Sequence, residues 1–408
     1  MTVKLEKDLL LEMLVVLDNQ IRRTAAAPRH RGLRIEAQDE TLAFSVNTPT
    51  EHLVRKFATA APTSFCVQVN FNAFRNAVQT CRTRLVPLSL TAKEIRVAGK
   101  SMSPGKVPAA QLVRPRVRLH ADLAPGIIGM CARAAQVVDP SSRIPSTHGI
   151  YLSESGITAM NRTEIIHLPC PVGLGGMTIP VPFALMETKC EDAGRIELWP
   201  DAQWKAHFRM IIGPWEWTAP EVSKRFPGWK RFMPRARKLV RRITLSKEAA
   251  AQLLAALRGL SDPGNRLTVV WSKAANGRLD VCAGTWNGSY PASFRGPWEK
   301  VRQGIRRKIL LHILSLEHDR FAFGDPVYSP FVATGGIGQF IAMPQFAPVD
   351  PSVEEGPPIA VSAMHEAIRI LDELDTDLEN FREKLKQLLH ESTVLHCRVR
   401  EVASLLKP

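Results

Sequence analysis

One order of predicted elements occurs three times along this chain of 408 residues, and such internal repetition constrains the fold more than any single motif. The middle copy, at 120–234, shows the order best. Its apolar-periodic helix begins at Leu123 and ends before Asp139 and Pro140, because a proline cannot continue a helix. A hairpin with strands at 149–152 and 157–160 follows, and then further strands and a short helix at 183–190. This order predicts an α+β domain.

The flanking parts of the chain repeat this order. Near the N-terminus, an amphipathic helix that begins near Leu9 is followed by a hairpin and by a second helix at 71–81. After a basic connector at 235–242, a helix capped by Ser246 is followed by a hairpin and by a second helix at 305–316. We therefore predict three tandem α+β domains, at 1–112, 120–234 and 242–346.

The last part of the chain does not repeat the pattern. A proline-rich linker is predicted at 347–358, and one long helix at 359–408. Apolar residues in this helix recur at alternating steps of three and four, which is typical of a coiled-coil seam. A one-sided seam needs a second helix, so we expect self-association or a partner helix, with packing onto the body as the alternative. The seam residues are Leu371, Leu374, Leu378, Phe381, Leu385, Leu388, Leu395, Val399, Val402 and Leu406.

The charge of the chain indicates a polyanionic partner. Lysine and arginine number 54 against 39 aspartate and glutamate residues, which gives a formal net charge of +15. Acidic residues outnumber basic ones within 350–408, so the rest of the chain is more basic still. Nucleic acid is the expected partner of such a chain, and charge retained only for solubility is the alternative.

Several classes of protein are disfavoured by the sequence. No apolar run approaches the ~20 residues of a membrane helix, and the charged N-terminus does not fit a signal peptide, so we expect a cytoplasmic, nucleoid-associated protein. The seven cysteines are scattered, which argues against a disulfide framework and a zinc site. The phosphate-loop, zinc-protease and nucleophile-elbow motifs are absent. We predict a non-enzymatic protein without cofactor or metal.

Short sequence motifs in the middle copy are similar to those of a known family. Arg143 precedes Gly-Ile-Tyr-Leu at 149–152, and Thr-Ala-Met-Asn-Arg-Thr-Glu-Ile occupies 158–165. Ile-Pro follows at 179–180, and Phe-Pro-Gly-Trp begins the stretch 226–234, which ends in Met-Pro. With these motifs and its threefold repeat, the chain resembles the bacterial DNA polymerase III beta subunit, the sliding clamp, over residues 1 to about 346. The added C-terminal helix is a departure from that family.

The resemblance implies a ring that holds duplex DNA. Two chains would close head to tail as a homodimer, with helices lining the hole and antiparallel sheets forming the outer wall. A ring that slides must contact phosphates rather than base edges, and long basic side chains suit that role. The residues implied on the lining helices are Arg22, Arg23, Arg75, Arg82, Arg133, Lys189, Arg258, Arg306 and Arg307. Those implied on the contacting loops are Arg29, Arg31 and Arg143.

The resemblance also implies an apolar cleft, between the second and third domains, for short peptide motifs of a polymerase or clamp loader. The matching positions are Ile165, Pro234, Ile341, Met343 and Pro344. Two departures bear on this cleft. Glu164 stands where the family has arginine, and the chain continues beyond the point where the family's chain ends.

A second basic concentration lies at 224–242, with nine cations and no acid in nineteen residues. Three aromatic residues, Phe226, Trp229 and Phe232, alternate with the cations. Such a pattern can stack on unpaired bases. The interpretation we favour for the aromatic residues is structural, as core and connector.

We predict a DNA sliding clamp-like protein that encircles duplex DNA, serves as a processivity factor in DNA replication, and tethers a partner. The alternative is a clamp-derived DNA-binding regulator of transcription or of a mobile element, in which the coiled coil sets oligomerisation or partner choice. A third hypothesis is a scaffold that acts through its tail and has no DNA role.

Overall fold

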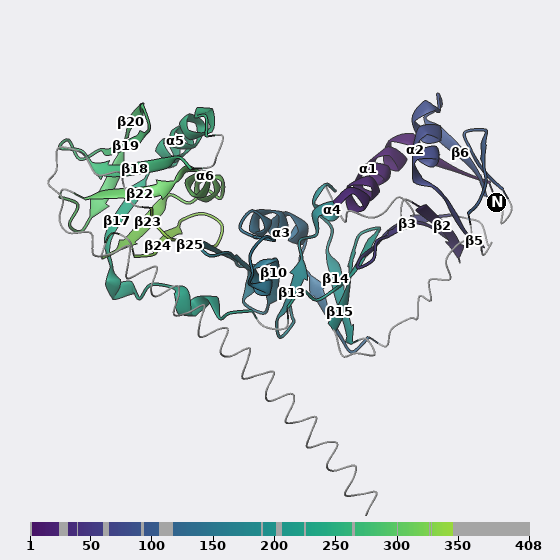
Figure 1. Ribbon diagram of the computed structural model, residues 1–408, viewed down its shortest axis with the longest axis horizontal. Coiled ribbons are helices and arrows are strands. Elements are labelled where there is room, and N and C mark those ends of the chain that lie inside the picture. Colours follow the sequence, from purple (N-terminus) through teal and green to yellow (C-terminus); the bar gives the residue numbers. More distant parts are fainter. Residues whose placement is uncertain are drawn as a thin grey trace, which may run out of the picture. The chain divides into compact units, whose positions relative to one another are not determined.

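The computed structural model describes residues 2–23, 32–38, 40–59, 65–90, 94–105, 117–188, 191–200, 206–223, 226–262, 266–299, 301–325, 327 and 329–345. Residues 1–347 form one compact unit (Figure 1), and the following account concerns that unit alone. The predicted linker and coiled-coil helix lie outside the described residues.

The first repeat contains the sequence strand, helix and three strands twice. α1 spans Lys7–Arg23 and α2 spans Phe71–Thr80, which confirms both predicted helices. Asn70 caps α2, because its side chain accepts a hydrogen bond from the Ala73 amide at 3.0 Å. The strands are β1 (Thr2–Glu6), β2 (Gly32–Gln38), β3 (Thr41–Asn47), β4 (His52–Ala58), β5 (Phe65–Asn70), β6 (Leu85–Leu90), β7 (Ile95–Val97) and β8 (Lys100–Met102).

The second repeat has the same sequence of elements, but its helices are shorter than predicted. α3 spans Ile127–Ala135, whereas the prediction began at Leu123, which instead ends a strand. Gly126 separates the two elements with φ +76°, a left-handed conformation that glycine adopts without strain. α4 is a single turn at Phe183–Met186. The strands are β9 (Leu119–Leu123), β10 (Gly149–Ser153), β11 (Gly156–Met160), β12 (Glu164–Leu168), β13 (Met177–Pro180), β14 (Gly194–Pro200), β15 (Ala206–Ile212) and β16 (Trp215–Pro220).

The third repeat begins inside the segment that was predicted as a connector. Only its first part is a connector, because residues from Leu239 onward form a strand. α5 spans Lys247–Gly259, and Ser246 caps it as predicted, accepting from the Ala249 amide at 3.1 Å. α6 spans Arg307–Ser315. The strands are β17 (Leu239–Leu245), β18 (Thr268–Lys273), β19 (Leu279–Ala283), β20 (Trp286–Tyr290), β21 (Ala292–Arg295), β22 (Arg302–Arg306), β23 (Arg320–Gly324), β24 (Phe331–Thr334) and β25 (Gln339–Ala342).

Antiparallel pairing joins consecutive repeats into continuous sheets. β4 pairs with β16 to give an eight-stranded sheet of order β5-β2-β3-β4-β16-β15-β14-β9. β12 pairs with β25 to give a nine-stranded sheet of order β13-β10-β11-β12-β25-β24-β23-β17-β21. Two four-stranded sheets remain, β1-β6-β7-β8 in the first repeat and β20-β19-β18-β22 in the third. Main-chain hydrogen bonds therefore hold the three repeats together.

Each large sheet has a helix face and a distal face. On the eight-stranded sheet, Phe44 of β3 packs against Phe74 of α2, with ring centroids 5.7 Å apart. On the nine-stranded sheet, Phe340 of β25 packs against His312 of α6, with ring centroids 5.1 Å apart. Successive side chains of a strand point to opposite faces, so the register assigns every other residue to a face. We call the face opposite the helices the distal face.

Candidate nucleic-acid interface

The helices of the first repeat present a charge cluster of three residues. The Asp18 carboxylate on α1 receives Arg22 Nη2 at 2.8 Å and Arg75 Nη1, from α2, at 2.7 Å. The Arg22 side chain is 69% exposed, whereas that of Arg75 is 29% exposed. Arg22 therefore retains free donors that a phosphate can accept from, while Arg75 chiefly ties α2 to α1.

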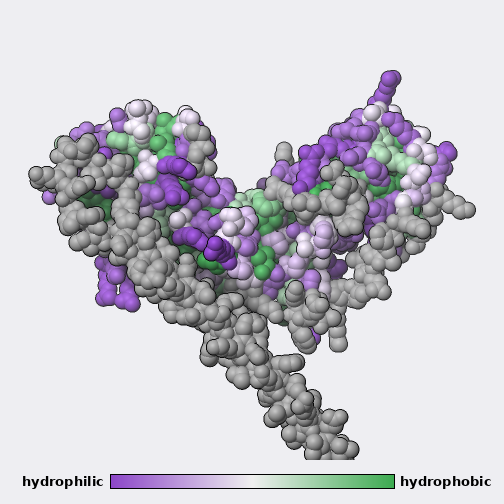
Figure 2. Space-filling view, viewed as in Figure 1, coloured by the Kyte–Doolittle hydropathy of each residue, from purple (hydrophilic) through white to green (hydrophobic). Residues whose placement is uncertain are grey.

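Three other predicted DNA-binding residues are exposed cations. Arg82 follows α2, Arg143 precedes the 3₁₀ turn Pro145–Thr147, and Arg258 lies in the last turn of α5. Within the described part of the chain, the guanidinium groups of these three make no ion pair. Each is free to meet a phosphate. Hydrophilic residues gather over α1 and α2 and around α6 (Figure 2).

Arg307 is used within the protein. Its Nε donates to the Leu257 carbonyl at 2.7 Å, and its Nη2 donates to the Arg258 carbonyl at 3.4 Å. The carbonyls of the last turn of a helix have no partner inside that helix, so Arg307 supplies the donors that the end of α5 needs. Its side chain is only 12% exposed. Arg307 thus packs α6 against α5.

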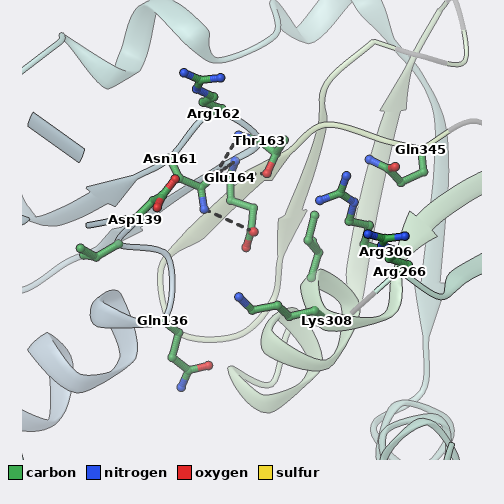
Figure 3. Close-up of a pocket in the computed structure, with 12 residues that line it drawn as sticks. Gln136, Asp139, Asn161, Arg162, Thr163, Glu164, Arg266, Arg306, Lys308 and Gln345 are labelled. Carbon is green, nitrogen blue, oxygen red and sulfur yellow. Dashed lines mark hydrogen bonds between the residues drawn. The ribbon is translucent and has the colours of Figure 1, made fainter. Parts of the chain in front are cut away.

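Arg306 lies at the rim of a polar cavity of about 710 Å³ (Figure 3). It is the last residue of β22 and the residue directly before α6, so the prediction that placed it inside the helix was wrong. Lys308, in the first turn of α6, and Arg266 line the same cavity. These cations lie at the positive end of the α6 dipole, which adds to the local positive potential.

A buried carboxyl group, that of Glu164, forms another wall of this cavity (Figure 3). Asn161 orders the turn before it, because the Asn161 Oδ1 accepts from the amides of Thr163 and Glu164, each at 2.8 Å. Burial raises the pKa of Glu164, and Asn161 together with Lys308 and Arg306 opposes that rise. The carboxylate offsets part of the surrounding positive charge.

Arg133 contributes a main-chain contact between the second and third repeats. His312 Nε2 lies 3.2 Å from the Arg133 carbonyl and must donate to it, because a carbonyl oxygen only accepts. Burial lowers the pKa of His312 to about 4, so the imidazole is neutral at pH 7 and carries its proton on Nε2. The Arg133 side chain is partly buried and lines a shallow cavity with residues of α3.

The predicted partner cleft contains a packed apolar cluster. Ile165 of β12 and Ile341 of β25 are directly paired and are 7% and 4% exposed. Met160, Val332 and Trp229 complete the cluster. Pro234, Met343 and Pro344 are half-buried. Because Trp229 of the chain itself packs against the two isoleucines, these positions do not form an open apolar groove in this structure.

Some predicted site residues lie outside the description. These are the side chain of Arg23, residues Arg29, Arg31 and Lys189, and every residue of the coiled-coil seam.

The sequence analysis missed Lys308, Arg266 and Arg162, the other cations of the polar cavity. Lys308 follows directly on Arg306 and Arg307, so the basic triplet at the start of a predicted helix was an available signal. Arg266 carried none. No cluster of potential metal ligands occurs among the described residues, and none of their helices is long and apolar enough to span a membrane.

Comparison with known proteins identifies the fold. No protein-family model and no curated protein matches this sequence. A structure of the DnaN sliding clamp (DNA polymerase III subunit beta) from Bartonella birtlesii, bound to griselimycin, is similar with a TM-score of 0.69 at 14% identity. The Caulobacter crescentus pol III beta gives 0.67 at 16%, and the DNA polymerase III beta subunit of Thermotoga maritima gives 0.66 at 11%.

Each of these three alignments covers 85% of this chain and 100% of the other chain. The match therefore spans the whole clamp and leaves out a part of this chain as long as its predicted tail. At such low identity the likeness concerns the fold. The predicted fold class is confirmed: the chain has the fold of the bacterial DNA polymerase III beta sliding clamps.

Proposed function

We propose that this protein is a non-enzymatic DNA clamp, which encircles duplex DNA and tethers a DNA-processing partner. The observation that carries the proposal is the combination of the clamp fold with exposed arginines in all three repeats, Arg22 on α1, Arg143 in the loop after α3 and Arg258 on α5. A full clamp fold offers a closed path around DNA, and dispersed cations bind phosphates without selecting a sequence. Replication is the process that the names of the similar structures indicate.

The lining set that we propose is smaller than the set implied by resemblance. Arg75 and Arg307 are excluded, because their guanidinium groups are engaged by Asp18 and by the end of α5. Lys308 and Arg266 are added from the polar cavity. The proposed set is Arg22, Arg82, Arg143, Arg258, Arg266, Arg306 and Lys308.

The internal symmetry of the sheets supports ring closure. Each repeat has two halves, and each half ends in a strand. The last strand of the first half of one repeat pairs with the last strand of the second half of the next repeat: β4 pairs with β16, and β12 pairs with β25. The strands left over by this rule are β8 and β20, and each is the edge of a four-stranded sheet. An unpaired edge is a ready site for another strand. We propose that β8 of one copy pairs with β20 of a second copy, twice, to give a head-to-tail homodimer.

The mass in solution tests this closure. Sedimentation should give twice the 45.3 kDa of the chain. Asn287 and Ser289 are exposed on β20, and replacing both with lysine opposes Lys100 of β8 with like charge, so dissociation should become easier by at least tenfold. Ala275→Lys, on the exposed turn between β18 and β19, is the control and should leave the mass unchanged. Monomeric mass for the wild type, the lysine variant and the control would refute ring closure.

Retention on DNA tests encirclement. Protein assembled on a nicked circular plasmid should stay bound through a high-salt wash and should leave when the plasmid is linearised, since a ring slides off free ends. A protein that stays on linear DNA and protects one footprint would instead support the regulator hypothesis. The variant Arg22→Gln, Arg82→Gln, Arg258→Gln should lower the slope of log affinity against log salt by about 0.9 for each lost phosphate contact. Equal salt slopes for variant and wild type would exclude these arginines from the lining.

A further inference from the structure

The basic stretch after β16 crosses the distal face of the nine-stranded sheet as a strap, which we define as residues 226–238. Phe226 stacks on Tyr151 of β10, with ring centroids 4.5 Å apart and planes at 7°. Trp229 stacks on His167 of β12, with centroids 4.2 Å apart and planes at 22°. The register places both partners on the distal face, because His167 pairs with Thr158 and Thr158 with Tyr151. The aromatic residues are thus anchors, as the sequence analysis favoured.

The strap's charged residues are exposed and unpaired. All five of its lysines and arginines are classed as exposed, and none makes an ion pair among the described residues. No aspartate or glutamate occurs from 226 to 247. Phe232, the one aromatic residue of the strap that is not an anchor, is 44% exposed beside them. The cations of the strap are Lys230, Arg231, Arg235, Arg237 and Lys238.

The strands next to the strap continue this positive charge. Arg242 of β17 is directly opposite Arg295 of β21, and both are exposed on the distal face. Arg320 of β23 is exposed on the same face, opposite Thr244. Like charges placed directly opposite across two strands destabilise a sheet. Two carboxylates lie beside this group: Asp325 is 3.8 Å from the buried Arg241, and Asp319, the residue before β23, is 3.7 Å from Arg320.

We infer that the strap and these strands form a second nucleic-acid-binding surface, which contacts the phosphodiester backbone. A dense set of cations with few acids is costly unless a polyanion neutralises it, and phosphates that release counterions suit it. The surface is separate from the proposed lining, because the strap packs on the distal face while α3, α5 and α6 cover the other face. In Figure 1 the strap forms the short teal-green turns below β24 and β25, away from α6. The inference does not require ring closure.

Binding to short linear DNA tests this surface, since a ring is not retained there. The strap variant Arg235→Gln, Arg237→Gln, Lys238→Gln removes exposed cations that form no ion pair with another described residue, so it should fold. The control Lys4→Gln, Arg84→Gln, Arg96→Gln removes the same charge from the first repeat. Binding is measured by fluorescence anisotropy across a salt series. For the strap variant, the slope of log affinity against log salt should be lower in magnitude by about 2 to 3 on duplex and by about 2 on oligothymidine. The control should match wild type.

The remaining outcomes decide between partners. If the strap variant loses affinity for oligothymidine alone, the surface binds single strands, with Phe232 as the stacking group. If it loses affinity for both oligothymidine and duplex, the surface binds any phosphodiester backbone. Additive losses when the strap and lining variants are combined support two separate surfaces. A strap variant that binds both nucleic acids as the control does overturns the inference. The inference is also overturned if the wild type and the strap variant bind both nucleic acids equally, while only the wild type binds vesicles with anionic lipids.

Discussion

The distal faces of the two large sheets differ in how their charges are balanced. Both sheets form by joining the last strands of two repeats. On the eight-stranded sheet the distal charges are matched: Arg209 Nε donates to Glu197 at 2.9 Å, and Arg195 Nε lies 3.1 Å from the same carboxylate. By register, the distal charges of this sheet are Arg34, Lys56, Arg195 and Arg209 against Glu36, Asp122, Glu197 and Glu216.

The nine-stranded sheet has only cations at the equivalent positions. Its described strands place Arg242, Arg295 and Arg320 on the distal face and no carboxylate, although Asp319, just before β23, lies 3.7 Å from Arg320, and the strap adds five more cations. A balanced face is neutral toward polyanions, whereas an unbalanced one attracts them. The difference indicates that the fold alone does not demand positive charge there. Charge on this face is therefore better explained by binding than by stability.

The strap's anchor should give the largest effect on stability. Trp229→Ala removes a side chain that is 7% exposed and packed on Ile165 and Ile341, so unfolding should become about 3–5 kcal/mol easier, measured by urea denaturation. Phe232→Ala, on the same strap but 44% exposed, is the matched control and should change stability by about 0.5 kcal/mol or less. Equal losses for both would show that the strap is not anchored as described.

Charge removal should have opposite signs on the two distal faces. Glu197 is 7% exposed and serves two arginines, so Glu197→Gln should destabilise by about 2–3 kcal/mol. Arg295→Gln relieves the repulsion with Arg242 and should stabilise by about 0.2–1 kcal/mol. Both are measured by urea denaturation at low ionic strength. A destabilising Arg295→Gln would mean that the basic face supports the fold, and it would remove the contrast between the sheets.

Sequence reasoning recovered the repeat but not the contacts between repeats. The hairpins, the Ser246 cap and most helices were local signals. The strands that were missed include β4, β12 and β16, three of the four strands that join the repeats. Trp215, Trp217 and Ala219 alternate along β16 and could have been found. The pairing of Ile165 with Ile341 could not, since nothing local specifies a register between residues so far apart in the chain.

The site was predictable only as a class of residues. Exposed arginines on the helices were expected, but which of them are engaged depends on distant partners, as with Arg75 and Asp18. Arg307 illustrates the same limit, because the carbonyl of Leu257 that it caps belongs to another helix. The strap was recognised by its composition. Its attachment to one face of a sheet required the position of His167 and Tyr151, which only the fold supplies.

The smallest predicted effect is a change in the pKa of His167, which lies against the strap and senses its positive charge. His167 lies beneath Trp229, and burial, with Lys230 second, lowers the pKa of its imidazole below the ordinary 6.5. The unfolded chain therefore binds this proton more readily, so the stability that His167 contributes is present above about pH 6.5 and declines as pH falls toward the folded pKa. Lys230→Gln removes one cause and should raise the pKa of His167, measured by NMR titration.

Arg231→Gln is the matched control for this titration, because Arg231 is the next residue of the strap and is exposed, yet only Lys230 acts on His167. It should move the pKa of His167 less than Lys230→Gln does. Added oligonucleotide gives the titration a functional reading: a phosphate bound beside Lys230 stabilises the imidazolium, so the pKa of His167 should rise in wild type. In the strap variant that lacks Arg235, Arg237 and Lys238, the rise should be smaller. A pKa that nucleic acid does not move would place the bound phosphates away from the nine-stranded sheet and leave its charge without the partner inferred for it.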